Sequence, residues 1–262
     1  MQLQVLENVV KAHTSYVETI HRFRDPEFNA AYQSMLRREG NLCRGPFLEI
    51  LPTYQAGATA TDGFARFVGA AVDAATLRAF APHENLYWHQ SEAMTRVSEG
   101  KNVMVTSGTG SGKTEAFLFP ILAHLYREAL SGKPRKPGVR ALILYPLNAL
   151  SNDQLDRLSD IAAALKKSNS KFRFTYGQYT GESPKTDQDA EQADRAQGAR
   201  HRTGEVRSRE AILRNPPDIL LTNYSMLEYL LIRPGDRPLF DHGQDWRFIV
   251  LDEAHQYNGT KG

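Results

Sequence analysis

The chain has 262 residues, of which 41% are hydrophobic and 24% charged, and its formal net charge is +2. This length allows one large α/β domain, alone or with an extension, and the near-neutral charge excludes a strongly basic nucleic-acid coat. The single cysteine, Cys43, excludes an intrachain disulfide and a zinc site built from cysteines.

The N-terminal stretch MQLQVLENVVKAHTSYVETIHRF lacks the basic cap and apolar core of a secretory signal. No apolar run in the sequence approaches the roughly 18 residues that a membrane span requires. We therefore expect a soluble, cytoplasmic protein that makes no contact with membranes.

Residues 1–84 are predicted to form a mostly helical, partly irregular N-terminal extension. Near its start, Leu6, Val10 and Val17 recur at helical spacing, and a second helical stretch, DGFARFVGAAVDAATLRAFA, ends at Pro82. A glycine and two prolines between these stretches predict extended chain. This region carries no recognisable chemistry, and we predict a packing role for it.

Residues 85–262 have a different sequence pattern from residues 1–84, because short apolar runs alternate with helical segments. The runs are NVMVT (102–106), ALILY (141–145), FRFTY (172–176), DILLT (218–222) and RFIVL (247–251). Such runs are typical of strands buried on both faces, and their alternation with helices predicts an α/β domain with a mainly parallel sheet.

One segment of this domain is polar and poor in apolar residues. It extends from about residue 183 to 204, and we predict a surface loop there. The string that follows, EVRSREAILR (205–214), is predicted to form a short helix.

The string SGTGSGKT follows the run NVMVT and precedes a helical segment, which is the context of a phosphate-binding loop. Glycines allow the backbone N–H groups to face one concavity, and the helix directs its positive end toward the same place. Lys113 is predicted to reach the β and γ phosphates, and Thr114 to bind Mg²⁺ through its hydroxyl. A glycine-rich turn without a ligand is the alternative.

The apolar run RFIVL ends in the string DEAH. Ligands of parallel sheets gather beyond the carboxyl ends of the strands. Asp252 is therefore predicted to hold Mg²⁺, and Glu253 to orient and deprotonate an attacking water. A solvated acidic pair at a strand end is the alternative. His255 has no second ligand at zinc spacing, so we do not predict a metal site there.

Together, SGTGSGKT and DEAH resemble motifs I and II of the superfamily 2 DEAD/DEAH-box helicases. LYPLNALSNDQ (144–154) and YTGE (179–182) are similar to motifs Ia and Ib, and DILLTNYSMLEYLLIRP (218–234) to the segment before motif II. The wording of these strings resembles bacterial helicases of DNA repair or phage defence. The resemblance covers about residues 44 to 262.

The resemblance implies a recombinase-like domain that binds ATP and Mg²⁺. It gives Gln90 the task of reading the adenine edge, because an amide offers both a donor and an acceptor, and it gives His255 the task of coupling the nucleotide site to a second domain. The implied nucleotide contacts are Gln90, Ser107, Gly108, Thr109, Gly110, Ser111, Gly112, Lys113 and Thr114. The implied catalytic residues are Lys113, Asp252, Glu253 and His255.

The resemblance also implies contacts with nucleic acid, and we expect DNA rather than RNA. Contacts of this family go to backbone phosphate and sugar, which favours weak sequence preference. The matching residues are Pro146, Asn148, Thr180, Gly181, Thr222 and Asn223.

Motif III and a second recombinase-like domain are expected in this family after motif II, and the sequence ends soon after His255. An arginine finger contributes roughly 10³- to 10⁵-fold to the rate in related phosphate-loop enzymes. We therefore expect the chain to be the ATP-binding N-terminal half of a helicase or translocase, completed in cis or in trans. Alone, it is expected to hydrolyse ATP weakly and not to unwind duplexes.

Two other functions are compatible with the phosphate loop. The chain could be a module that binds ATP or single-stranded nucleic acid without turnover and regulates a partner, although such a module does not need the base Glu253. A small-molecule kinase or GTPase is disfavoured, because the sequence has no Asn-Lys-x-Asp string and DEAH has no task there.

Overall fold

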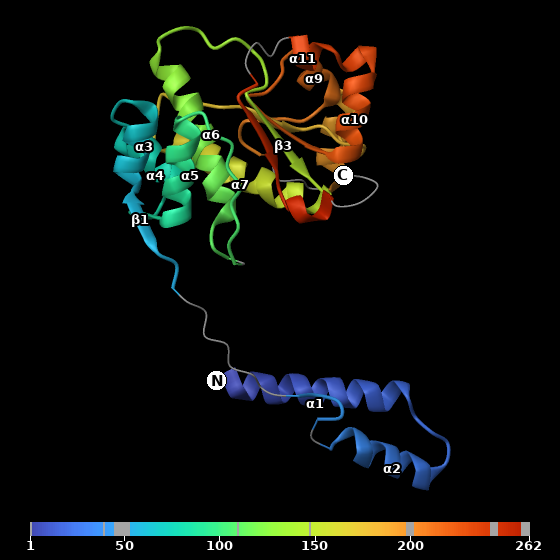
Figure 1. Cartoon of the computed structure of the whole chain (residues 1–262). Coiled ribbons are helices and arrows are strands. Elements are labelled where there is room, and N and C mark those ends of the chain that lie inside the picture. The colour runs from blue at the N-terminus through green and yellow to red at the C-terminus, as the bar shows by residue number, and fades with distance from the viewer. Residues whose placement is uncertain are drawn as a thin grey trace. The chain divides into compact units, whose positions relative to one another are not determined.

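The computed structural model describes residues 2–38, 40–44, 53–108, 110–146, 148–197, 202–241 and 246–257. The chain divides into two compact units, Met1–Thr53 and Tyr54–Gly262 (Figure 1). The division thus follows Thr53, whereas the sequence predicted an extension that runs to residue 84. Residues 54–84 pack within the second unit, where Phe64 and Phe80 join its core.

The first unit is a pair of helices, α1 (Gln2–Ile20) and α2 (Pro26–Leu36). The side chain of Asp25 caps α2 by accepting a hydrogen bond of 2.9 Å from the Phe28 N–H. An ion pair of 2.9 Å between Arg37 and Glu18 joins the segment after α2 to α1. The mostly helical character predicted for this end of the chain is therefore confirmed.

The core of the second unit is a five-stranded parallel sheet with the order β5-β4-β6-β3-β7. The strands are β3 (Ala141–Tyr145), β4 (Tyr176–Gln178), β5 (Glu205–Val206), β6 (Ile219–Asn223) and β7 (Phe248–Leu251). The predicted α/β class and three of the predicted strands are thereby confirmed. The run predicted at 172–176 becomes a strand only at its last residue.

The run at 102–106 is not a strand, which corrects the prediction. Residues 101–108 have no regular structure, and Met104 is 86% exposed. The outer edge of β7 is unpaired among the described strands, and Ile249 and Leu251 of that strand are 67% and 54% exposed. A free edge and an apolar pattern are therefore not enough, because strand formation depends strongly on the tertiary packing around the run.

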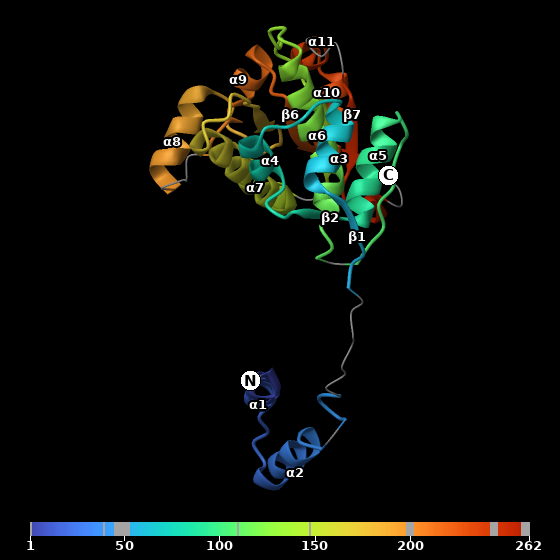
Figure 2. The same cartoon turned by 90° about the vertical axis from the view of Figure 1, so that its left-hand side faces the viewer.

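Helices cover the sheet on both faces (Figures 1 and 2). One face holds α3 (Ala60–Val68), α4 (Ala74–Phe80), α5 (Trp88–Ser98), α6 (Lys113–Leu130) and α7 (Asn148–Lys167). The other holds α9 (Arg209–Arg214), α10 (Tyr224–Ile232) and α11 (Pro238–Asp241). Along β3, Ile143 and Tyr145 join the first core, while Leu142 and Leu144 join the second.

A small antiparallel pair, β1 (Ala56–Thr59) and β2 (Asn85–Tyr87), leads into α5. Two short 3₁₀ segments, Pro234–Asp236 and Ala254–Tyr257, complete the second unit. Within the described residues, no helix combines the length and apolar character of a membrane span.

The polar segment predicted as a loop at 183–204 contains a helix, α8 (Asp187–Gln197). Its start is fixed by a reciprocal cap, in which the Asp189 N–H donates to the Thr186 hydroxyl at 3.1 Å and the Thr186 N–H donates to the Asp189 carboxylate at 3.0 Å. Ala190 is buried, and Asp194 pairs with Arg207. Local capping thus stabilises a helix that the polar composition of the segment did not predict. The predicted helix at 205–214 begins later, at Arg209, after β5.

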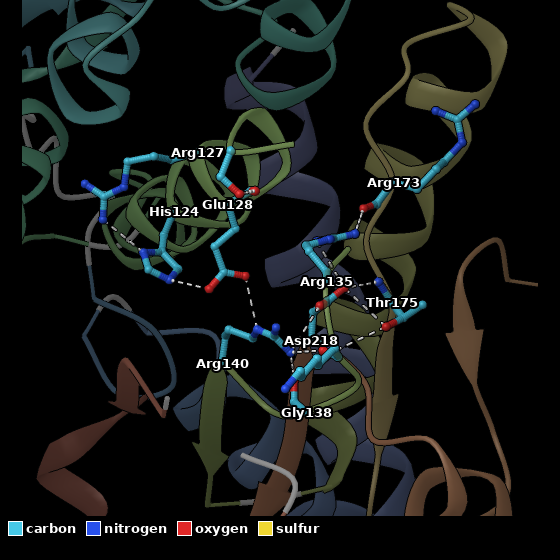
Figure 3. Close-up of polar contacts among 11 residues, drawn as sticks. His124, Arg127, Glu128, Arg135, Gly138, Arg140, Arg173, Thr175 and Asp218 are labelled. Atoms are coloured by element: carbon cyan, nitrogen blue, oxygen red, sulfur yellow. Dashed lines mark hydrogen bonds and ion pairs between the residues drawn. The ribbon is translucent and has the colours of Figure 1, made fainter. Parts of the chain in front are cut away.

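A network of charged residues ties the segment between α6 and β3 to the amino ends of the strands (Figure 3). Arg140 lies between Glu128, at 3.1 Å, and Asp218, at 4.0 Å. Asp218 also accepts a hydrogen bond of 2.9 Å from the Thr175 N–H, and Arg135 approaches its carboxylate to 3.5 Å. Because each carboxylate has at least two partners, the network offsets much of the cost of desolvating these charges.

His124 lies at the α6 end of this network and is only 7% exposed (Figure 3). Burial lowers its pKa below the ordinary value, against the opposing charge of Glu128. A histidine with a lowered folded-state pKa binds protons more readily when unfolded. Its contribution to stability is therefore complete above about pH 6.5 and is lost as the pH falls below that value.

We expect the substitution His124→Gln to reduce the loss of stability between pH 7.5 and pH 5.5. The measurement is the free energy of unfolding in urea at both pH values, for wild type and variant. A difference between the two pH values that is equally large in the variant would show that His124 does not titrate on unfolding.

Candidate functional site

The predicted phosphate loop precedes α6, and its backbone carbonyls contact the side chain of Lys113. The Lys113 ammonium donates hydrogen bonds to the carbonyl oxygens of Ser107 (2.9 Å) and Gly108 (3.1 Å). The hydroxyls of Ser107 and Ser111 lie 2.5 Å apart, and Ser111 is buried. Thr114 follows in the first turn of α6 and is half-buried. Thr109 lies outside the described residues.

Two glycines give the loop its shape, since Gly110 and Gly112 both have φ of +74°. This left-handed conformation is open to glycine at little cost. The surroundings of the two glycines differ. A Cβ on Gly112 would lie 2.5 Å from the amide nitrogen of Gln90 and 3.1 Å from Oε2 of Glu115, whereas a Cβ on Gly110 would meet nothing within 4 Å.

This difference makes a matched pair of variants. Gly110→Ala is expected to cost only the strain of a left-handed alanine, about 1–2 kcal/mol. Gly112→Ala adds a clash with Gln90 and is expected to weaken nucleotide binding more strongly. Titration of ATP·Mg²⁺ into each variant measures the effect, and equal affinities in the two variants would contradict the crowding around Gly112.

Gln90 is 5% exposed and connects α5 to the phosphate loop. Its Oε1 accepts a hydrogen bond of 2.9 Å from the Tyr87 N–H, and its Nε2 donates one of 3.0 Å to the Gly112 carbonyl. One lone pair and one amide hydrogen remain, so the side chain can still match both a donor and an acceptor. Beside it, Tyr87 stacks on His89 at 5.8 Å, and Trp88 is half-exposed.

The carboxylates of the DEAH string follow β7 in a tight turn. The Asp252 N–H donates to the Leu144 carbonyl at 3.0 Å, which continues the pairing with β3 by one residue. The Glu253 N–H donates to the Asp252 carboxylate at 2.9 Å, and Glu253 has a positive φ of 50°. This turn aims the two neighbouring carboxylates differently, and His255 Nδ1 lies 3.2 Å from Glu253 Oε2.

Electrostatics link these carboxylates to the phosphate loop. Burial raises the pKa of Asp252, and the charge of Glu253 raises it further, while the Glu253 N–H and the charge of Lys113 act in the opposite direction. The charge of Lys113 thus acts on Asp252 from the phosphate loop. That the two motifs cooperate in one site stays a prediction.

Two tyrosines beside Asp252 escaped the sequence analysis. Burial, followed by the charge of Asp252, raises the pKa of both Tyr145 and Tyr257. Both hydroxyls are buried without a hydrogen-bond partner among the described residues. Tyr145 was visible only as the last residue of an apolar run, and nothing in the sequence distinguishes it from a core residue.

The residues at this site fit Mg²⁺ rather than a metal held entirely by the protein. Among the described residues, no cluster of three or more histidine, cysteine or acidic side chains could hold a metal ion. Mg²⁺ is ordinarily held by one or two protein oxygens together with substrate phosphates and water. A carboxylate at Asp252 and a hydroxyl at Thr114, beside a phosphate loop, are a donor set of this kind.

A hollow of about 830 Å³ lies beside the phosphate loop. Its lining includes Gln90, Gly110 and Gly112, residues of α6 and α7, and the segment 78–87. Its volume is in the range of pockets that hold a small ligand.

The predicted nucleic-acid residues lie at the carboxyl ends of β3, β4 and β6, which are neighbours in the sheet. Asn223 donates a hydrogen bond of 2.9 Å to the side chain of Asn148, so these two residues meet. Thr180 and Thr222 are each 1% exposed, and Thr222 donates to the Tyr179 carbonyl at 2.6 Å. The two threonines are therefore buried and support the backbone of this edge. Gly181 is exposed, and Pro146 is half-buried.

Arg209 is a further residue at this edge that sequence reasoning missed. Its guanidinium donates to the carbonyls of Thr180 (2.6 Å) and Gly181 (2.8 Å) and lies over the ring of Tyr179. It holds the turn after β4 in place from α9. No motif marks it, because its partners are backbone atoms far away in the sequence.

Comparisons with known proteins agree with this geometry. The family model for the DEAD/DEAH box helicase matches residues 87–262. The chain is 27% identical over 332 residues to the Druantia protein DruE of Escherichia coli, with 94% of this chain and 18% of that protein covered. It is 30% identical over 174 residues to the ATP-dependent helicase Lhr-Core of Methanothermobacter thermautotrophicus, with 66% and 18% covered.

One solved structure supports the fold. The crystal structure of the DUF1998 helicase MrfA bound to DNA and AMPPNP matches with a TM-score of 0.52 and 22% identity, covering 79% of this chain and 23% of that one. The chain therefore spans about a fifth of the length of each of these relatives. The individual site residues remain predictions, because none of these comparisons tests them.

Proposed function

Because the chain belongs to the DEAD/DEAH box helicase family, we propose that it forms the ATP-binding domain of an ATP-dependent DNA helicase or translocase. Hydrolysis of ATP would be coupled to nucleic-acid binding at the carboxyl ends of the neighbouring strands β3, β4 and β6. The observation that carries the proposal is the loop before α6, where Lys113 contacts the Ser107 and Gly108 carbonyls and Gly110 and Gly112 take the left-handed conformation.

Each residue of this site has a distinct proposed role. The ammonium of Lys113 exchanges its bonds to the Ser107 and Gly108 carbonyls for bonds to the β and γ phosphates. Thr114 and Asp252 would hold Mg²⁺, which supplies neutralising charge when it is bound. Glu253 orients a water and accepts its proton, and its contact with His255 keeps the carboxylate in place.

The edge formed by Asn148, Asn223 and Gly181 is the proposed track for nucleic acid. The MrfA structure is described as bound to DNA, and we propose DNA for this chain as well. Contacts at this edge would go to phosphate and sugar, so binding is expected to depend strongly on salt and weakly on sequence.

We further propose that a second recombinase-like domain, in cis or in trans, completes the ATP site. The coverage of only 18% of DruE and of Lhr-Core supports this proposal. Hydrolysis by residues 1–262 alone is then expected to be weak, because an arginine finger contributes roughly 10³- to 10⁵-fold in related enzymes. A role in phage defence or DNA repair, in the cytoplasm, remains a prediction.

Single-turnover hydrolysis of ATP by residues 1–262 tests the proposal, with Mg²⁺, with and without single-stranded DNA, and beside Lys113→Ala. Binding of ATP that depends on Lys113, with little turnover, is the expected result. Turnover well above the Lys113→Ala control and raised by DNA would contradict the need for a second domain. Absence of ATP binding by the wild type would overturn the proposed function itself.

A further inference from the structure

An ion pair between α6 and α7 lies directly behind the phosphate loop and has no place in the motifs described so far. Arg157 of α7 contacts Glu115, in the first turn of α6, and the two side chains are 38% and 20% exposed. Both line the hollow beside the loop, together with Gly110 and Gly112. The pair therefore joins the start of the phosphate-binding helix to a neighbouring helix.

Glu115 also packs against the backbone of the loop. Its Oε2 would lie 3.1 Å from a Cβ on Gly112, and the same position lies 2.5 Å from Nε2 of Gln90. This oxygen is buried and has no hydrogen-bond partner among the described residues. Thus Arg157 holds one oxygen of the carboxylate, while the other faces the turn that aims Lys113 at the phosphates.

The amino end of α7 lies at the proposed nucleic-acid edge. Asn148 is the first residue of α7 and accepts the hydrogen bond from Asn223. Arg157 lies nine positions after Asn148 in the helix, or roughly 14 Å at 1.5 Å per residue. A movement of Asn148 along the helix axis is transmitted to Arg157, because an α-helix resists axial compression through its backbone hydrogen bonds.

We propose that Glu115 and Arg157 are a positioning pair through which nucleic acid bound at the start of α7 changes the nucleotide affinity of the phosphate loop. The inference rests on the proposed function. Neither residue needs to touch the phosphates, since the pair acts through Gly112 and the first turn of α6. Coupling of this kind is reciprocal, so bound nucleotide changes the affinity for DNA by the same factor.

The test uses the 1–262 chain and measures the Kd of ATP·Mg²⁺ with and without saturating oligo(dT). The ratio of the two values is the coupling factor. We expect Glu115→Gln and Arg157→Gln to bring this coupling factor toward one. The expected change in the factor is about 3- to 30-fold. The double variant should be no worse than either single variant, because two partners of one interaction are not additive.

Asp156→Asn is the matched control. Asp156 neighbours Arg157 on α7, but its carboxylate pairs with Arg202 at 2.8 Å. This variant removes a charge from the same helix and is expected to leave the coupling factor unchanged. Arg157→Lys, which keeps the positive charge, is expected to restore part of it.

Thermal unfolding of each variant separates positioning from folding. A coupling factor lost at nearly unchanged Tm supports the proposal, whereas a factor retained in both Gln variants overturns it. A wild-type chain that binds ATP without any response to oligo(dT) also overturns it, yet leaves the proposed ATP site intact. A wild-type chain that binds no ATP overturns the proposed function first.

Discussion

Replacing Lys113 with alanine is expected to weaken the binding of ATP·Mg²⁺ by about 2–5 kcal/mol, or 30-fold and more. The reason is that the ammonium is the charged donor inside the phosphate loop, where its two present partners are neutral carbonyl oxygens. Charge-assisted hydrogen bonds to phosphate are roughly twice as strong as neutral ones. Calorimetric titration with a non-hydrolysable ATP analogue measures the loss.

Lys113→Arg is the companion variant, because it keeps the charge and changes the shape of the donor. A planar guanidinium presents its donors in a fixed fork and not as a compact point charge, so affinity should also fall, though less than for alanine. Unchanged affinity in Lys113→Ala would contradict the assignment of the loop as a phosphate site.

The second large effect is expected from Glu253→Gln, which should reduce hydrolysis about 10²- to 10⁴-fold. An amide of the same shape cannot accept the proton of the attacking water, but it preserves the turn at Glu253 and the packing around it. ATP binding should therefore stay within about threefold of wild type, since general-base catalysis acts on the reaction and not on ground-state binding.

Hydrolysis of radiolabelled ATP over long single-turnover incubations, at enzyme in excess, is sensitive enough for a weak wild-type rate. His255→Ala is the companion variant, because it removes the contact that positions Glu253 but keeps the carboxylate itself, and it is expected to reduce the rate less than Glu253→Gln. A rate unaffected by Glu253→Gln would indicate that another group activates the water.

Prediction from sequence succeeded where a single local signal decides the structure. The run 141–145 is apolar at every position, and all five residues are buried between two layers of helices. The position of Asp252 at the end of β7 was predictable for a related reason, because its apolar run ends at the acidic pair. The run 102–106 is also apolar but forms no strand, because its pairing depends on tertiary packing that no local pattern encodes.

Other predictions failed because the deciding contacts join residues far apart in the sequence, or because one local signal outweighed another. Phe172 and Phe174 lie in a predicted strand but pack as stacked rings 6.2 Å apart, with Phe172 against Phe80 of α4. The sequence contains the capping pair Thr186 and Asp189, but the polar composition of the segment favoured a loop. Glu115 and Arg157 meet only through the packing of α6 on α7, which one sequence does not reveal.

The position of β3 has a consequence for how motion is distributed in the molecule. This strand is bonded on both sides, and its amino end is held by the network of Arg140, Glu128 and Asp218. Its amide protons should therefore be among the last to exchange with deuterium, at rates close to those of global unfolding. Residues 101–108, without regular structure, should exchange within seconds, so the domain would rearrange around its ligands while the centre of the sheet stays closed.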